Sequence, residues 1–218
     1  MAIFAPEIRD RIRNCGVAAV LIIEDARNAV RLAKALLKGG IDAMELTLRT
    51  PAALDSIRAI SDSVPEMLVG AGTVISPVQV AQVAEAGAAF AVSPGVNSDV
   101  LSAAADAGLP FAPGIMTPTD IETALTHECQ LLKFFPAESS GGLPHLKNIA
   151  APYRHLGLEF IPLGGLTEKN MATYLAEPLV AAVGGSWLAK PDVIKSENWA
   201  LISETAAAAK GIAASARH

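Results

Sequence analysis

Apolar residues gather in short runs that recur along the chain at intervals of 20 to 29 residues. Eight such runs, rich in valine, isoleucine, leucine and alanine and followed by turn residues, predict eight β-strands. The runs begin near Val17, Ile41, Met67, Ala89, Pro110, Gln130, Glu159 and Val180. They are continuously apolar rather than alternating, which is typical of strands that are buried on both faces.

Stretches with helical spacing separate these runs. The first covers residues 26–37, where Asp25 is expected to cap the start and Gly39-Gly40 to end the helix. Three more helices are expected to start where a hydroxyl residue precedes a proline, because the hydroxyl accepts a free amide and the proline loses no bond. These starts are Thr50-Pro51, Ser76-Pro77 (with Gln79 as its capping-box partner) and Thr117-Pro118. Further helices are predicted over residues 6–13, 142–151, 168–175 and 199–213.

Strands that alternate with single helices pair in parallel through right-handed crossovers. Eight such units within 218 residues match one α/β barrel of the (β/α)8 or TIM type, with an extra N-terminal helix over residues 6–13. An open, doubly wound sheet is the alternative. No linker or change in composition divides residues 1–218, so we expect a single domain. In a TIM barrel the chemistry lies at the carboxyl ends of the strands.

Composition narrows the class of protein. Hydrophobic residues make up 51% of the chain and charged residues 18%, which supplies a large core. The net charge is 17 − 22 = −5 and gives no electrostatic reason to expect a nucleic acid or a membrane as partner. Residues 1–10 carry charges where a signal peptide needs an apolar run, and Cys15 and Cys129 form no CxxC motif. We therefore expect a cytoplasmic protein with two free thiols.

Lys133 is a charged residue within an apolar strand, Leu131-Leu132-Lys133-Phe134-Phe135. Lysine is almost never fully buried unless it is paired or functional. Apolar surroundings favour the neutral amine, and a neutral amine attacks a carbonyl to form a Schiff base. The alternative interpretation is a lysine that extends to the strand end or pairs with a carboxylate.

Glu45 and Arg49 belong to the second predicted strand. A carboxylate inside a barrel can shuttle protons, or it can form an ion pair, and a contact between Glu45 and Lys133 would serve both interpretations. Residues 45, 47 and 49 share one face of an extended strand, so Glu45, Thr47 and Arg49 are expected to point the same way. An arginine fork at a barrel mouth suits a carboxylate or a phosphate, and the alternative is an ion pair with Glu45 or a solvated charge.

Small residues end several other strands. Thr73 closes a Gly-Ala-Gly-Thr turn, where small residues let the backbone approach a ligand and the hydroxyl can donate a hydrogen bond. The last two strands both end in paired glycines, and this matches the phosphate site that many barrels build there from backbone amides. These two turns are Leu163-Gly164-Gly165 and Gly184-Gly185-Ser186.

No motif in the chain indicates a metal or another cofactor. The four histidines are scattered, without metal-ligand spacing, and neither a Ser-His-Asp order nor a nucleophile elbow is present. We therefore expect no metal and no cofactor, and chemistry that runs through an amine.

These motifs together resemble a known family, the class I aldolases of 2-dehydro-3-deoxy-phosphogluconate (KDPG) and 4-hydroxy-2-oxoglutarate (KHG). The resemblance runs from about residue 17 to about residue 199, with the motifs in the family's order and spacing. The motifs begin at Glu45 (ELTLRT), Gly70 (GAGTV), Phe90 (FAVSPG), Leu132 (LKFFPAE), Gly164 (GG) and Gly184 (GGSW).

The resemblance implies a role for each matching residue. Lys133 is expected to form the Schiff base and Glu45 to shuttle protons. Arg49 and Thr73 would bind the substrate carboxylate, and Pro94 and Phe135 would line the pocket. The remaining residues would hold the substrate phosphate: Gly164, Gly165, Gly184, Gly185 and Ser186. The resemblance also implies a homotrimer and a phosphorylated keto acid as the small-molecule substrate.

One departure leaves the substrate open. Leu163 stands in the pocket where many family members have threonine, and this removes a hydroxyl. The same chemistry on the galactonate epimer, or on an unphosphorylated keto acid, is therefore an alternative. A sugar-phosphate isomerase or epimerase that uses Glu45 as a base, and a non-catalytic barrel that binds phosphorylated metabolites, are alternatives from other classes.

Overall fold

A computed structural model describes residues 4–217, in which strands and helices alternate along the chain. The strands are β1 (Val17–Leu21), β2 (Ala43–Thr47), β3 (Leu68–Gly72), β4 (Phe90–Val92), β5 (Phe111–Ala112), β6 (Gly114–Ile115), β7 (Leu131–Phe134), β8 (Glu159–Pro162) and β9 (Val183–Gly185). The α-helices are α1 (Pro6–Cys15), α2 (Ala29–Lys38), α3 (Ala53–Ser63), α4 (Pro77–Glu85), α5 (Ser98–Asp106), α6 (Pro118–Thr126), α7 (Gly142–Ala150), α8 (Met171–Leu175), α9 (Pro191–Lys195) and α10 (Trp199–Ala216). Short 3-10 helices are η1 (Ala26–Asn28), η2 (Glu138–Ser140) and η3 (Ala151–Leu156).

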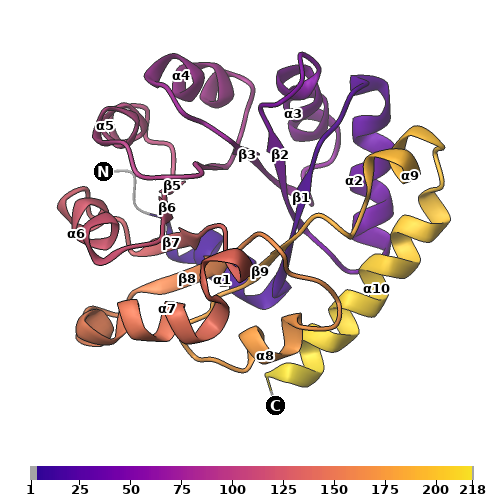
Figure 1. Ribbon diagram of the computed structural model, residues 1–218. Helices are drawn as coiled ribbons and strands as arrows, with labels where there is room; N and C mark the ends of the chain where they lie inside the picture. Colours follow the sequence, from indigo (N-terminus) through magenta and orange to yellow (C-terminus); the bar gives the residue numbers. More distant parts are fainter. Residues whose placement is uncertain (1–3, 218) are drawn as a thin grey trace.

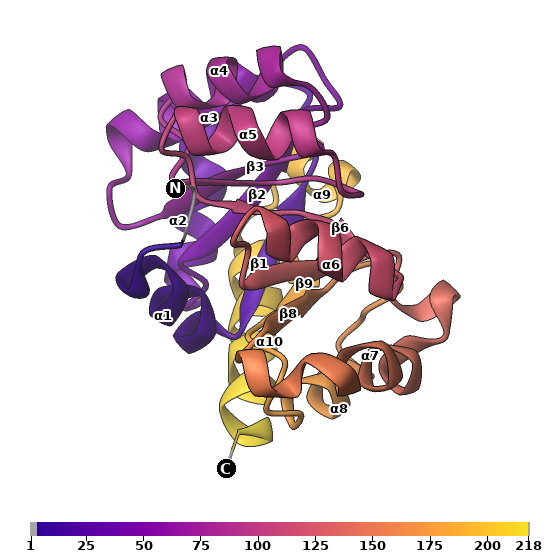
Figure 2. The same ribbon diagram turned by 90° about the vertical axis from the view of Figure 1, so that its left-hand side faces the viewer.

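The strands pair in parallel and form a curled α/β fold. Six strands form one sheet in the order β5-β4-β3-β2-β1-β9, and three form a second sheet in the order β6-β7-β8. Helices α2 to α7 lie around the outside of the strands (Figure 1), with α3, α4 and α5 on one side and α7 and α8 on the opposite side (Figure 2). Each of the eight predicted apolar runs contains a strand.

Backbone hydrogen bonds link the two sheets at both of their edges. The fifth predicted strand is divided at Pro113 into β5, which pairs with β4, and β6, which pairs with β7. At this edge the N–H of Lys133 donates to the carbonyl of Pro113 at 2.9 Å. At the other edge, the N–H of Ala181 donates to the carbonyl of Phe160 at 2.9 Å, just before β9.

Two of the three helix starts predicted from a hydroxyl residue before a proline are confirmed, because in both the hydroxyl accepts a hydrogen bond from a main-chain N–H of the first turn. Ser76 accepts from the N–H of Gln79 at the start of α4, and Thr117 forms a capping box at the start of α6. The side chain of Gln79 accepts from Ile75 rather than from Ser76. The start predicted at Thr50-Pro51 is wrong: α3 begins at Ala53, because the hydroxyl of Thr50 donates to the carbonyl of Ile23 instead of capping the helix.

Two helices lie outside the predicted set, α5 and the short α9. The stretch predicted as one helix over residues 26–37 is a 3-10 turn, η1, that leads into α2, and Asp25 caps the turn by accepting from the N–H of Arg27. The predicted extra helix over residues 6–13 is α1.

Helix α1 lies against the amino ends of the strands. Its arginines Arg9 and Arg13 both pair with Glu159, which is buried and is the first residue of β8. The side chain of Ile12 points into the interior and lines the same cavity as Glu45 and Lys133. This end of the strands is therefore filled by α1. Within residues 4–217 no helix has the length and apolarity needed to cross a membrane.

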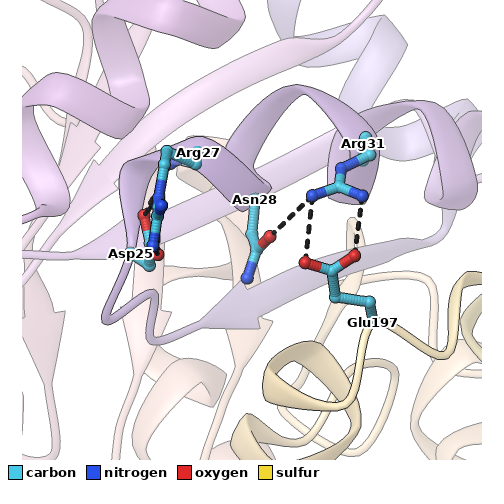
Figure 3. Close-up of polar contacts among 5 residues, drawn as sticks. All are labelled: Asp25, Arg27, Asn28, Arg31 and Glu197. Carbon is cyan, nitrogen blue, oxygen red and sulfur yellow. Dashed lines mark hydrogen bonds and ion pairs between the residues drawn. The ribbon is translucent and has the colours of Figure 1, made fainter.

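Polar contacts join the first α/β unit to the segment that precedes the last helix, α10. The guanidinium of Arg31 on α2 forms two bonds to the carboxylate of Glu197, at 2.7 and 3.0 Å (Figure 3). It also donates to the amide oxygen of Asn28 at 3.3 Å and lies 5.3 Å from the ring centre of Trp199. A bidentate arginine pair of this kind is geometrically specific, so it orients the connection between α9 and α10.

Candidate active site

Lys133 on β7 and Glu45 on β2 meet in the interior, although 88 residues separate them in the sequence. The ammonium Nζ of Lys133 lies 3.2 Å from Oε1 of Glu45. Both residues are buried, with 6% of Lys133 and 3% of Glu45 exposed. The structure therefore contains the contact that would serve both interpretations of Glu45, as a proton shuttle and as a member of an ion pair. Removal of two charges from water is costly unless they pair, which explains why each residue needs the other in this position.

The glycines of β3 make room for side chains of the protein rather than for a ligand. A β-carbon on Gly72 would lie 2.6 Å from Cγ and Cδ of Glu45, and one on Gly70 would overlap the ring of Phe90. The register of the sheet places Glu45 beside Gly70, one residue from Ala71 and two from Gly72. The Gly-Ala-Gly sequence is therefore what allows a carboxylate to fit inside the sheet at this point.

Replacement of Gly72 by alanine is expected to displace the carboxylate of Glu45. Overpacking of this kind typically costs about 1–3 kcal/mol of folding free energy, and a displacement of about 1 Å lowers turnover by about 10²-fold. Steady-state turnover and thermal unfolding measure both effects. Gly211→Ala on α10 is the control, because an added β-carbon there has nothing within 4 Å. Equal turnover for Gly72→Ala and Gly211→Ala would contradict this role of Gly72.

Arg49 does not continue the strand of Glu45. Strand β2 ends at Thr47, and Arg49 lies in the following turn, where its N–H donates to the carbonyl of Thr47 at 2.7 Å. The predicted common face of Glu45, Thr47 and Arg49 is therefore wrong beyond Thr47, because the chain stops being extended there. The hydroxyl of Thr47 donates to the carbonyl of Leu21 at 3.2 Å. Arg49 is exposed at the carboxyl end of β2, and within residues 4–217 its side chain forms no ion pair.

Thr73, Pro94 and Phe135 each follow a strand at the same end of the sheet as Arg49. Thr73 is half-buried directly after β3 and has a left-handed backbone, with φ of 60°. Pro94 is exposed after β4, and its main chain packs against Gly114 of β6. The ring of Phe135, just after β7, has its centre 5.4 Å from Nζ of Lys133.

The glycine turn after β8 lies beside the residues that follow Lys133. Gly164 and Gly165 have φ values of 96° and 82°, a conformation that favours glycine. A β-carbon on Gly164 would lie 3.3 Å from the ring of Phe135. Within residues 4–217 the main-chain N–H groups of Gly164, Gly165 and Ser186 make no hydrogen bond to a protein acceptor.

The glycines of β9 are covered by side chains. A β-carbon on Gly184 would lie 2.6 Å from a methyl carbon of Leu163, and one on Gly185 would lie 2.6 Å from the ring of Trp187. Leu163 is buried and forms an apolar wall of the interior near Lys133. Ser186, the last predicted phosphate residue, is exposed directly after β9.

Lys133 and Glu45 are the charged residues of an otherwise apolar cavity. The cavity has a volume of about 20 Å³, which is the space of a single water molecule. Its other lining residues are Ile12, Ala18, Val20, Phe90, Val92, Ile161, Leu163 and Gly184. In residues 4–217 no group of three or more histidine, cysteine, aspartate or glutamate side chains is arranged to hold a metal ion.

Comparison with known proteins assigns this site to an enzyme family. A family model described as KDPG and KHG aldolase matches residues 8–205. The 2-dehydro-3-deoxy-phosphogluconate aldolase of Pseudoalteromonas atlantica is 45% identical over 190 residues, which are 87% of each chain. The KHG/KDPG aldolase of Escherichia coli K12 is 42% identical over 87% of this chain and 88% of its own.

A solved structure agrees with these sequences. The KDPG aldolase of Legionella pneumophila, with pyruvate captured at low pH as a covalent carbinolamine intermediate, superposes with a TM-score of 0.87 at 39% identity. The match covers 92% of this chain and 96% of that one. The protein is therefore an aldolase, an enzyme of the lyase class. Within that class the chain belongs to the KDPG and KHG aldolase family.

Proposed function

We propose that the protein is a class I aldolase that cleaves KDPG to pyruvate and glyceraldehyde 3-phosphate, KHG to pyruvate and glyoxylate, or both. The observation that carries this proposal is the buried pair of Lys133 on β7 and Glu45 on β2, 3.2 Å apart in the interior of the fold. It is supported by the relatives named KDPG aldolase and KHG/KDPG aldolase.

The roles of the site residues follow from the chemistry of an amine and a carboxylate. The ammonium of Lys133 gives up a proton and its amine attacks C2 of the keto acid; the C2 oxygen takes up protons and leaves as water, which gives a protonated imine. Arg49 and Thr73 hold the C1 carboxylate. The protonated imine takes up the electrons of the C3–C4 bond while Glu45 accepts the proton of the C4 hydroxyl, and the aldehyde leaves. Protonation of the enamine at C3 and addition of water release pyruvate and restore the lysine.

The other end of the substrate lies among the turns after β4, β8 and β9. Pro94 and Phe135 line the pocket. The phosphate is held at the turns that contain Gly164, Gly165, Gly184, Gly185 and Ser186. Two features support this: the N–H groups of Gly164, Gly165 and Ser186 have no protein acceptor within residues 4–217, and backbone amides bind anions. No cofactor or metal takes part in the proposed reaction.

Borohydride trapping with pyruvate tests the proposal directly. A class I aldolase forms an imine with pyruvate, and borohydride reduces it to a stable amine. We expect the intact mass to increase by one pyruvyl group and peptide mapping to place it on Lys133. Absence of an adduct from folded protein would contradict the aldolase mechanism and would favour an isomerase or a binding protein.

Leu163 is expected to govern the choice between the two phosphorylated C4 epimers. A hydroxyl at this position can bond a substrate hydroxyl, which is typically worth about 0.5–1.5 kcal/mol, or roughly 2- to 10-fold in kcat/KM. Leu163→Thr should therefore change the ratio of kcat/KM for the gluconate- and galactonate-derived substrates by that factor. Leu163→Val is the control, since it loses similar volume without adding a hydroxyl. An equal change of the ratio in both variants would show that the size of the side chain at position 163, and not a hydroxyl, determines the preference between the two epimers.

We further infer that residues 1–218 form one domain and that the two sheets close into a single (β/α)8 barrel. The bonds from Lys133 to Pro113 and from Ala181 to Phe160, which join the sheets at both edges, support closure. Residues 1–3 and 218 lie outside the described part of the chain.

We also infer a cytoplasmic homotrimer that binds neither nucleic acid nor membrane. The two free, buried cysteines suit a reducing compartment, and Ile75, Val78 and Met116 are exposed apolar side chains of the kind that a subunit interface covers. Size-exclusion chromatography with light scattering should give the mass of three chains, and the mass of one chain would contradict the trimer.

A further inference from the structure

The segment after the lysine strand is tied through its main chain to the glycine turn after β8. Strands β7 and β8 pair in register from Leu131 to Phe134. Beyond the strands, the N–H of Ala137 donates to the carbonyl of Leu163 at 2.7 Å, and the N–H of Glu138 donates to the carbonyl of Gly164 at 3.0 Å. The position of Glu138 therefore determines where this turn lies relative to Lys133.

The side chain of Glu138 packs against Gly165 of the turn. A β-carbon on Gly165 would lie 2.6 Å from Cβ and 2.8 Å from Cγ of Glu138, so the two residues are in close contact. On another side of the turn, the amide nitrogen of Asn170 donates to the carbonyl of Gly165 at 3.3 Å. The turn is held between the Glu138 segment and the residues that lead into α8.

Tyr174 on α8 fixes the carboxylate of Glu138. The phenol of Tyr174 donates a hydrogen bond to Oε1 of Glu138 across 36 residues of sequence. Tyr174 is only 2% exposed, whereas Glu138 is exposed. Burial, and then the bond to Glu138, hold the pKa of Tyr174 well above its usual value, so the phenol stays a neutral donor. Without this donor the carboxylate can turn toward a bound phosphate, which it repels.

We propose that Glu138 and Tyr174 are positioning residues for the phosphate group of the substrate. Their contact orients the Gly164-Gly165 turn relative to Lys133 and directs the negative charge of Glu138 to the phenol. This inference rests on the proposed function, because it assumes that the turn binds phosphate. Neither residue touches the reacting carbon atoms, so the effect is confined to substrates that carry a phosphate.

The two substrates of the family provide the test, since KDPG carries a phosphate and KHG does not. We expect Tyr174→Phe and Glu138→Ala to lower kcat/KM for KDPG by about tenfold through KM, which corresponds to about 1.4 kcal/mol, and to change kcat/KM for KHG by less than twofold. Glu138→Gln should retain the wild-type value for KDPG, because its amide oxygen still accepts from Tyr174 and its stem still supports Gly165.

The control is Tyr153→Phe, which removes a matched bond from Tyr153 to Glu122 (2.8 Å) on the outer surface. Tyr153→Phe should leave kcat/KM unchanged for both KDPG and KHG. An equal loss for KDPG and KHG in Tyr174→Phe, or no loss for either, would overturn the inference while the wild type still forms its pyruvate adduct. A wild type that forms no pyruvate adduct would overturn the proposed aldolase function itself, whereas a wild type whose kcat/KM is no higher for KDPG than for KHG would overturn only the phosphate site at the glycine turns.

Discussion

Replacement of Lys133 by alanine is expected to abolish both the pyruvate adduct and turnover. Lys133 is the amine that lines the cavity, and the other residues that line the cavity offer no second amine to form an imine. Loss of a covalent nucleophile removes the reaction path rather than slowing one step, so turnover should fall by at least about 10⁴-fold. Borohydride trapping followed by intact mass, together with a pyruvate-release assay, measures the two effects.

The same substitution has a cost in stability. It leaves the carboxylate of Glu45 buried without its partner, and removal of one member of a buried pair typically costs about 3–5 kcal/mol. The matched control is Lys147→Ala, which breaks a lysine–glutamate pair of 2.6 Å at the surface, where the lysine side chain is 42% exposed. Surface pairs contribute about 0–1 kcal/mol, so this control should unfold nearly like the wild type and should keep its activity.

A second variant keeps the prediction testable if Lys133→Ala does not fold. The double substitution Lys133→Met and Glu45→Gln removes the amine and also removes the unpaired charge. It should fold more stably than Lys133→Ala and should be equally inactive. A pyruvyl adduct on this double variant, mapped to any other lysine, would contradict the assignment of Lys133.

The central pair was predictable because its signal is local. A charged residue inside a continuous apolar run stands out in the sequence, and both Lys133 and Glu45 do so. The sequence left open whether these two residues meet, and indicated only that a contact between them would serve both interpretations of Glu45. The structure shows that they do meet, with 3.2 Å between Nζ of Lys133 and Oε1 of Glu45.

Other predictions were wrong or incomplete because the local structure differs from a regular strand or helix at the positions concerned. Arg49 was expected on the face of Glu45, but β2 ends at Thr47 and two-residue alternation has no meaning in a turn. The cap at Thr50 was wrong because a tertiary acceptor, the carbonyl of Ile23, competes for its hydroxyl. Helix α5 is rich in alanine, which gives little periodic contrast between its faces.

Side-chain contacts between elements that are distant in the sequence could not be predicted, because no sequence pattern marks them. The bond between Tyr174 and Glu138 joins a helix to a turn 36 residues earlier, and neither residue type is unusual where it stands. Gly72 is a similar case. Its motif indicated a turn of small residues, but the space that a side chain at position 72 would fill is occupied by the side chain of Glu45 on the neighbouring strand. The pairing of Glu45 with the glycines of β3 becomes visible only when the sheet register is known.

Replacement of Glu45 by glutamine is expected to separate imine formation from carbon–carbon cleavage. Glutamine has nearly the same shape, and its amide oxygen can still accept a hydrogen bond from Nζ of Lys133, so the pair distance of 3.2 Å should be nearly retained. It cannot accept a proton from the C4 hydroxyl. A positioned acid–base group typically contributes about 10²–10⁴-fold, and turnover of KDPG should fall by that factor.

The decisive comparison is between trapping and turnover in the same protein. Glu45→Gln should still acquire the pyruvyl group on Lys133 under borohydride, because the amine remains, while release of pyruvate from KDPG is slow. Glu177→Gln is the matched control, since Glu177 pairs with Lys147 at the surface and is remote from the cavity. If Glu45→Gln turned over like the wild type, the proton would have to leave through another group, and Glu45 would serve only to keep Lys133 in place. If instead both trapping and turnover were lost with the fold intact, Glu45 would be required already for the attack of Lys133 on C2.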